Sequence, residues 1–236
     1  MRKTWTITAA LALALAGATA EAQYYGRGGG SDNAFRFRVG MFTPEGDSEY
    51  WLDNEAVFGG EPEDLEDVVL GADFRFGLGS RLGLIVSGDL FEGEDELAYL
   101  DIVDEFGNDI FHTTSLEVSA ITAGLVLDLT PPDSTVVPYV GVGGGYYLWT
   151  LTEDGDFVDF GDPLGPSIFT TTFEDEGEVL GWYWMAGLEV PIGPQWSLFA
   201  EGRWHNAEDE LSGDFAGLGD LDLSGRQISG GASWRF

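Results

Sequence analysis

The chain ends with RQISGGASWRF (Arg226–Phe236), and this stretch decides the fold. Every second residue in it is apolar or small: Ile228, Gly230, Ala232, Trp234 and Phe236. The residues between them are polar or small. Successive side chains of a β-strand point to opposite faces of a sheet. The stretch is therefore predicted to be a strand with one apolar and one polar face, ending on an aromatic ring.

The same alternation recurs in seven earlier segments, so we predict eight strands. The earlier segments are Ala34–Phe42, 68–77, 81–91, 115–129, 138–151, 178–190 and 196–205. Each has about ten residues or more, the length that a tilted strand needs to cross a bilayer. In the fourth segment we expect Leu116, Val118 and Ala120 to face outward. Its alternation is less clear near 120–124, where we expect a β-bulge.

The connections between these segments alternate in length. Three are short and rich in Gly, Pro or Ser: GLGS (77–80), TPPDST (130–135) and PIGPQ (191–195). Four are long and acidic: Pro44–Glu66, Glu92–Thr114, Glu153–Gly177 and Asn206–Asp222. Short turns at one end and long loops at the other are typical of outer-membrane barrels. The predicted fold is all-β, an eight-stranded antiparallel up-and-down transmembrane β-barrel.

The N-terminal residues indicate export. Arg2 and Lys3 precede an apolar stretch and small-residue sites that end at Ala22, the pattern of a secretory signal peptide. We predict that residues 1–22 are removed, that 23–33 form a short periplasmic segment, and that 34–236 form the barrel. The longest later apolar run, Val136–Trp149, is interrupted by Pro and Gly and is a poor helix. A membrane-spanning fold for this chain would have to be a closed barrel.

A soluble β-sandwich would show the same alternation with the apolar face inward. Three features favour lipid outside and polar residues inside: the signal peptide, the sorting of loops by length, and aromatic residues near the strand ends. These aromatic residues are Tyr146, Tyr147, Trp149, Trp182, Trp184, Trp196, Trp204 and Trp234.

The formal net charge is −32, which excludes ordinary nucleic-acid binding because that requires clustered cations. Most carboxylates lie in the four long connections. We expect these connections to be solvated and mobile. Weak divalent-cation binding beside anionic lipopolysaccharide is the alternative, although the spacing of an EF-hand loop is absent from the sequence.

Three stretches resemble the small eight-stranded outer-membrane proteins of Gram-negative bacteria, the OmpA/OmpX-like β-barrel superfamily. They are PYVGVGGGYY (138–147), GLEVPIGPQWSLFAEGRW (187–204) and LSGRQISGGASWRF (223–236). The resemblance covers the mature chain and implies a location in the bacterial outer membrane. It also implies that the terminal strand, with Trp234 and Phe236, is the signal read by the outer-membrane assembly machinery. The superfamily includes anchors, adhesion proteins, small channels and a few lipid-modifying enzymes.

The polar faces of the strands carry ionisable residues that we expect inside the barrel. They are Arg36, Arg38, Asp73, Arg75, Asp89, Glu117, Glu189, Glu201, Arg203 and Arg235. Side chains just fill an eight-stranded barrel, so charges there must pair. A structural ionic network is the first interpretation, and a narrow gated ion path is the second. Glu189, Glu201 and Arg203 share a predicted hairpin and are expected at its centre.

An enzyme hypothesis depends on His205 and Asn206, which resemble part of the His-x-Ser-Asn motif of a lipid A deacylase. Ala207 follows Asn206, and no Ser lies two positions after His205. A histidine in the aromatic girdle at a strand end is the simpler reading, and His112 lies in an acidic connection. Gly141 and Gly143 lack the remaining spacing of a dinucleotide-binding loop.

We therefore expect an outer-membrane, porin-like barrel without catalytic activity, cofactor or metal. Its expected role is structural or in surface interactions, in contact with outer-membrane lipid and lipopolysaccharide. A narrow channel for small or hydrophobic solutes is the alternative, and a lipid A-modifying hydrolase is the third hypothesis.

Overall fold

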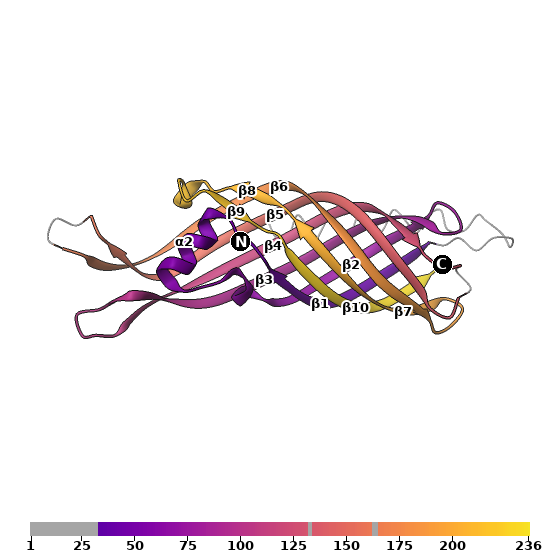
Figure 1. Cartoon of the computed structure of the whole chain (residues 1–236), viewed down its shortest axis with the longest axis horizontal. Coiled ribbons are helices and arrows are strands. Elements are labelled where there is room, and N and C mark those ends of the chain that lie inside the picture. The colour runs from indigo at the N-terminus through magenta and orange to yellow at the C-terminus, as the bar shows by residue number, and fades with distance from the viewer. Residues whose placement is uncertain (1–32, 132–133, 162–164) are drawn as a thin grey trace.

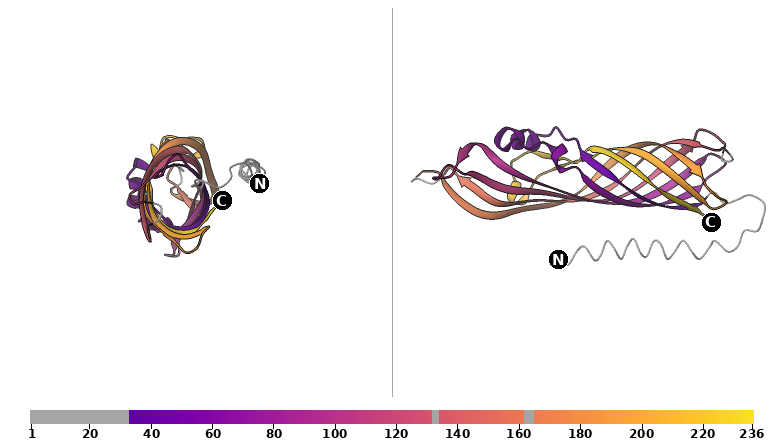
Figure 2. Two further views of the ribbon diagram at one scale, coloured as in Figure 1. Left: turned by 90° about the vertical axis from the view of Figure 1, so that its right-hand side faces the viewer. Right: turned by 90° about the horizontal axis from the view of Figure 1, so that it is seen from below.

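The computed structural model describes residues 33–131, 134–161 and 165–236. The predicted signal peptide and nearly all of the segment 23–33 lie outside these residues. Eight long strands close into one antiparallel barrel, in the order β1-β10-β7-β6-β5-β4-β3-β2 (Figure 2). They are β1 (Ala34–Pro44), β2 (Asp67–Gly77), β3 (Leu82–Val103), β4 (Asp109–Asp128), β5 (Val137–Asp159), β6 (Ser167–Pro191), β7 (Trp196–Asn206) and β10 (Gly225–Arg235). The predicted fold class is confirmed.

The barrel closes where the C-terminal strand pairs with the first strand. Phe35 lies opposite Trp234, and Phe37 lies opposite Ala232, in a register that continues to Pro44 and Gly225. Beyond the strand, the backbone N–H of Phe236 donates to the carbonyl oxygen of Asn33 at 3.2 Å. Closure removes the free edges that an open sheet would expose.

The two ends of the barrel differ, as the sequence predicts. Short connections follow β2, β4 and β6, and the C-terminus lies at the same end (Figure 1). We call this the short-turn end. At the opposite end, which we call the hairpin end, β3–β4 and β5–β6 extend as long hairpins (Figure 1).

The prediction that Glu92–Thr114 and Glu153–Gly177 connect the strands is wrong, because most of both segments is itself strand. β3 continues to Val103, β4 begins at Asp109, and β5 and β6 continue to Asp159 and from Ser167. A strand tolerates many carboxylates when they occupy its solvent-facing positions, and the Thr and Phe residues in these segments favour strands. The sequence analysis therefore missed the outer part of each hairpin because of its acidic composition.

The other two long connections also fold. Pro44–Glu66 contains helix α2 (Glu49–Phe58) and the 3₁₀ turn η1 (Pro62–Leu65). Gly59 follows the last residue of α2 and caps the helix with a φ of 75°, which suits glycine. Asn206–Asp222 contains a small two-stranded sheet, β8 (Glu208–Glu210) with β9 (Asp220–Asp222), and the 3₁₀ turn η2 (Gly213–Phe215).

Strand β4 corrects a second prediction. Its register with β3 is uninterrupted from Leu127 to Phe111, so the expected bulge at 120–124 is absent from this described strand. Leu116 and Val118 are buried inside, whereas Glu117 is exposed outside. Both faces of β4 carry small residues, so its sequence does not show which face points inward. Its pairing with β3 and β5 decides this.

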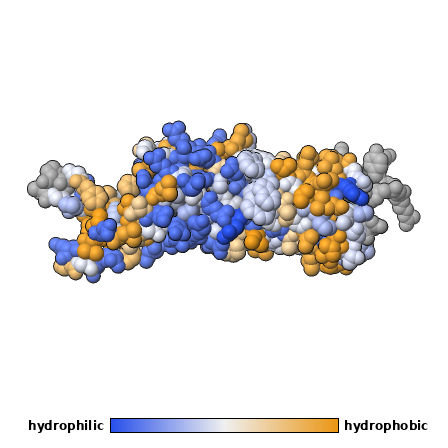
Figure 3. Space-filling view, in the orientation of Figure 1, coloured by the Kyte–Doolittle hydropathy of each residue, from blue (hydrophilic) through white to orange (hydrophobic). Residues whose placement is uncertain are grey.

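The outer surface is apolar towards the short-turn end and hydrophilic over the middle, with apolar patches again at the hairpin tips (Figure 3). Outward rings include Trp184 and Trp204, which stack with centroids 3.8 Å apart. Of the aromatic residues near the predicted strand ends, Tyr147 and Trp149 do not face lipid, because both are buried inside. The helices of the described residues are all too short or too polar to cross a membrane.

The apolar outer band gives a first prediction. Val39 lies mid-strand on β1 with half of its surface exposed, so Val39→Arg should destabilise the protein in lipid vesicles by about 2–4 kcal/mol. Leu100→Arg, at an exposed position in the β3 hairpin, is the matched control and should change stability little. Urea unfolding in vesicles measures both. Equal effects would place Val39 outside the lipid-facing band.

Candidate functional site

The centre of the lumen holds a compact ionic cluster. Arg36 donates to Glu201 at 2.7 Å, and Nε of Arg203 donates to the other oxygen of Glu201 at 2.7 Å. Asp73 accepts from Arg38 and lies 3.3 Å from Arg203 and 3.6 Å from Arg36. All five side chains are almost fully buried. Each charge therefore has an oppositely charged partner inside the barrel. A buried charge without such a partner would be strongly destabilising.

The cluster continues towards the hairpin end through Asp89. Nη2 of Arg38 lies 2.6 Å from Asp89, and Arg203 lies 3.8 Å from it. Arg203 also donates to Ser87 at 3.2 Å. The cluster thus joins side chains from β1, β2, β3 and β7, strands that are far apart in sequence.

A second ionic group lies nearer the short-turn end. Arg75 donates to Asp128 at 2.7 Å, and Arg235 donates to Glu189 at 2.7 Å. Arg75 and Glu189 lie 4.0 Å apart and connect the two pairs. Glu189 therefore belongs to this outer group and not to the central cluster with Glu201, because it lies on a neighbouring strand one level nearer the turns.

Charges balance within the two ionic groups, in which five arginines pair with five carboxylates. These are Arg36, Arg38, Arg75, Arg203 and Arg235 with Asp73, Asp89, Asp128, Glu189 and Glu201. The prediction that Glu117 belongs to this set is wrong, since it faces outward. Asp128 is the inward carboxylate of β4 instead. It is on the same face of the strand as the inward Val126 and Gly124, because it lies two and four residues from them.

Uncharged polar and aromatic groups complete the cluster, and sequence reasoning missed them. The hydroxyl of Tyr139 accepts from Arg36 at 2.8 Å and donates to Glu201 at 2.7 Å. The guanidinium of Arg36 also lies 3.8 Å from the centre of the Phe199 ring. On the facing wall, an added Cβ at Gly143 would lie 2.7 Å from the Tyr183 ring. Glycine on β5 thus leaves room for an aromatic ring inside the barrel.

His205 marks the boundary between this ionic region and an apolar one. Its ring nitrogens contact the hydroxyl of Tyr147 at 2.9 Å and the amide oxygen of Gln227 at 3.1 Å. The expected girdle position is wrong, because His205 is buried inside the barrel. A cavity of about 20 Å³ lies beside it, next to Asp89 and Phe42, with room for about one water molecule.

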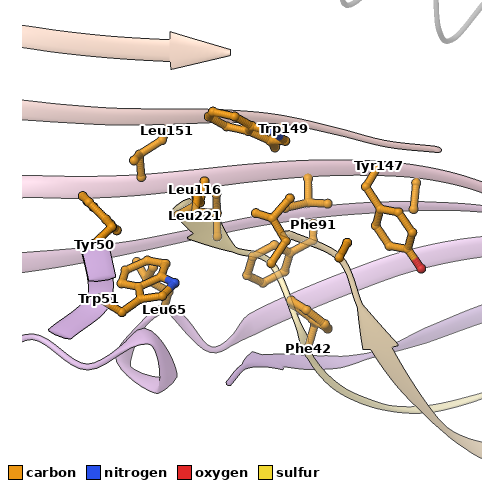
Figure 4. Packing of buried hydrophobic residues seen from close by; sticks show 14 of the residues in the cluster. Phe42, Tyr50, Trp51, Leu65, Phe91, Leu116, Tyr147, Trp149, Leu151 and Leu221 are labelled. Atoms are coloured by element: carbon orange, nitrogen blue, oxygen red, sulfur yellow. The ribbon is translucent and has the colours of Figure 1, made fainter. Parts of the chain in front are cut away.

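An apolar core fills the lumen from this boundary to the hairpin end (Figure 4). Phe42 and Phe91 pack edge to face with centroids 4.9 Å apart, and Leu116 and Leu151 are almost fully buried. Helix α2 adds Trp51, and the 206–224 connection adds further residues. The added residues are Ala207, Leu211, Phe215, Leu221 and Leu223.

Hydrogen bonds hold the folded connections on this core. Nε1 of Trp51 donates to the carbonyl of Asp222 at 2.9 Å, and Tyr50 donates to Glu153 at 2.7 Å. Burial and the neighbouring Glu153 carboxyl hold the pKa of Tyr50 well above its usual range. Asp175 accepts from both the backbone and the hydroxyl of Ser212. The connections are therefore part of the packed structure.

His112 belongs to the β3–β4 hairpin and not to a loop as predicted. It is buried on β4 beside Phe58 of α2, with ring centroids 4.4 Å apart, and beside Phe157. This apolar setting at the hairpin end lowers the pKa of His112 to about 4 by burial. In the residues described, three or more His, Asp or Glu side chains nowhere gather in a group able to hold a metal ion.

The comparisons with known proteins agree with this geometry. The family model of the outer membrane protein beta-barrel domain matches residues 6–236. The chain belongs to this family. It is a bacterial outer-membrane β-barrel protein, and its localisation is confirmed.

Two solved structures of outer-membrane proteins share this barrel fold. Neisserial surface protein A is 12% identical with a TM-score of 0.52, and the match covers 89% of this chain and all of that one. OprG from Pseudomonas aeruginosa is 12% identical with a TM-score of 0.51, covering 89% of this chain and 98% of that one. No curated protein sequence matches the chain. These likenesses establish the barrel fold alone, and they leave the activity open.

The central cluster of this outer-membrane barrel gives a second prediction. Arg203→Ala leaves Glu201 and Asp73 with one partner fewer each, so it should cost about 3–5 kcal/mol in unfolding free energy. The double change Arg203→Ala/Glu201→Ala should cost less than the sum of the single changes. Urea unfolding in vesicles measures the cycle.

A surface pair of the same type is the control for that cycle. Arg226 lies 2.9 Å from Glu45 and half of its side chain is exposed, so Arg226→Ala should cost less than about 1 kcal/mol. Strict additivity at Arg203 and Glu201 would contradict the pairing.

Proposed function

We propose that this barrel is a non-conducting, non-enzymatic surface protein that anchors structured acidic hairpins outside the cell. The short-turn end then faces the periplasm and the hairpin end faces the medium, as in other outer-membrane barrels. In this proposal the barrel contacts outer-membrane lipid and lipopolysaccharide, and the hairpins take part in structural or surface interactions.

The closed lumen carries the proposal. Arg38 and Arg203 in the ionic region, and Leu116 and Leu151 in the apolar core, have at most 1% of their surface exposed. A water-filled path would wet the side chains that line it. The lumen is therefore filled at two successive levels, first by the ionic region and then by the apolar core. This argues against the alternative of a narrow channel.

A lipid hydrolase has little support among the described side chains. Both ring nitrogens of His205 contact groups other than a serine, and His112 lies in an aromatic setting. Neither histidine has the nucleophile–base arrangement that acyl transfer requires.

Planar-bilayer recording of the refolded protein tests the proposal. We expect no steady conductance steps, with or without small hydrophobic solutes, because the apolar core blocks ions even where the ionic cluster fluctuates. A variant that alters the ionic cluster alone, Arg38→Ala, should also stay silent. Reproducible conductance of the unmodified protein would contradict the proposal and favour the channel.

We also propose that the terminal strand is read by the outer-membrane assembly machinery. In the finished barrel, the rings of Trp234 and Phe236 lie together with centroids 5.3 Å apart. Burial of one aromatic ring contributes only about 1.5–3 kcal/mol to stability. If Phe236 is part of a recognition signal, its loss should reduce assembly in cells more than the loss of this burial energy explains.

Deletion of Phe236 separates these two roles. We expect the folded outer-membrane fraction in cells to fall far more than the unfolding free energy measured after refolding into detergent. Trp196→Ala, at an exposed aromatic position on β7 opposite Trp234, is the control for ring burial alone. Small and equal effects in both assays would leave Phe236 as an ordinary girdle residue.

A further inference from the structure

The two long hairpins separate near their tips. Strands β4 and β5 pair from Asp128 and Tyr139 as far as His112 and Gly155. Beyond that point the β3–β4 and β5–β6 tips diverge (Figure 1). A cleft of about 560 Å³ lies there. Its size is within the range of clefts that bind small molecules or single peptide side chains.

The cleft is lined by apolar side chains from both hairpins. Ile110 and Val158 are buried, whereas Val103, Phe106 and Ile168 are 53%, 81% and 45% exposed. These residues lie far from the lipid-facing band. β3 runs 12 residues from its last pairing with β2 at Phe91 to Val103, roughly 40 Å along the strand. Lipid therefore does not explain their exposure, and gathered apolar side chains in water typically mark binding sites.

The charge around the cleft is entirely negative. The sequence has no Lys or Arg between Arg81 and Arg203, a span that includes both hairpins. Asp104 and Glu105 stand at the cleft. The side-chain amide and backbone N–H of Asn108 donate to Asp104 and lower the pKa of that carboxyl, so it stays ionised. An apolar cleft with this rim attracts cations and repels anions.

We propose that this cleft binds a cationic amphipathic peptide segment of an external partner. An aliphatic or aromatic side chain of the segment enters between Phe106 and Ile168, and its Lys or Arg side chains meet the carboxylates of the rim. The proposal rests on the proposed function, since it requires the hairpins to face the medium. A second copy of this chain fits poorly because it would bring an equally acidic rim to the same place. An anionic membrane surface is repelled for the same reason.

Binding of a defined probe tests the proposal. The protein is placed in nanodiscs of zwitterionic lipid, and a fluorescein-labelled peptide of alternating Leu and Lys is titrated by anisotropy. We expect saturable binding that weakens with added salt. A peptide with Glu in place of Lys, and one with Ser in place of Leu, should each bind at least about tenfold more weakly.

Variants at the exposed tip locate the site. Phe106→Ser with Val103→Ser should weaken binding at least about tenfold, because the lost contacts are apolar. Leu100→Ser is the matched control, at a 60% exposed position on β3 outside the cleft lining, and should leave binding unchanged. Glu105→Gln should weaken binding mainly at low salt, and Glu210→Gln is its control.

The outcomes separate the two proposals. Binding that is absent, unaffected by these tip variants, or equal on empty nanodiscs overturns the cleft proposal. Reversible self-association by sedimentation that depends on Phe106 would identify a second copy as the occupant and also overturn it. If any of these results occurs and the bilayer recordings show no conductance, the proposed function still stands. Steady conductance overturns the proposed function regardless of the peptide-binding result.

Discussion

Closure of the first strand onto the last is the constraint on which the rest of this protein depends. Once β10 pairs with β1, eight strands enclose a lumen that side chains just fill. Water is then largely excluded, so each inward arginine needs a carboxylate within reach. Arg36 and Arg38 on β1 therefore meet Asp73, Asp89 and Glu201 on other strands.

The interior changes character along its axis, and that change links the barrel to its hairpins. Ion pairs fill the short-turn half, and an apolar core fills the hairpin half. Helix α2, which follows β1, and the 206–224 connection between β7 and β10 complete this apolar core. The hairpins thus continue directly from a packed interior.

The proposed function depends on the filled lumen and on the exposed surface of the hairpins. In the proposed function, the filled lumen offers no wetted path, and His205 contacts groups other than a nucleophilic serine. The surface proposed for interaction is that of the hairpins, where hydrophilic and apolar patches lie side by side (Figure 3). Family membership places that surface on an outer-membrane barrel, whose members share architecture more than activity.

The sequence by itself determined that eight strands form the barrel and how the short and long connections are sorted, and the up-and-down barrel that these imply pairs Arg226–Phe236 with Ala34–Phe42. Period-two alternation and turn residues are local signals, and closure permits only one partner for the last strand. Tertiary structure alone decided that Glu117 faces outward and that Asp128 pairs with Arg75, because small residues on both faces of β4 leave its inward face to the register with its neighbours. It also decided that acidic connections fold, since Tyr50, Trp51 and Leu221 gain stability only from partners distant in sequence.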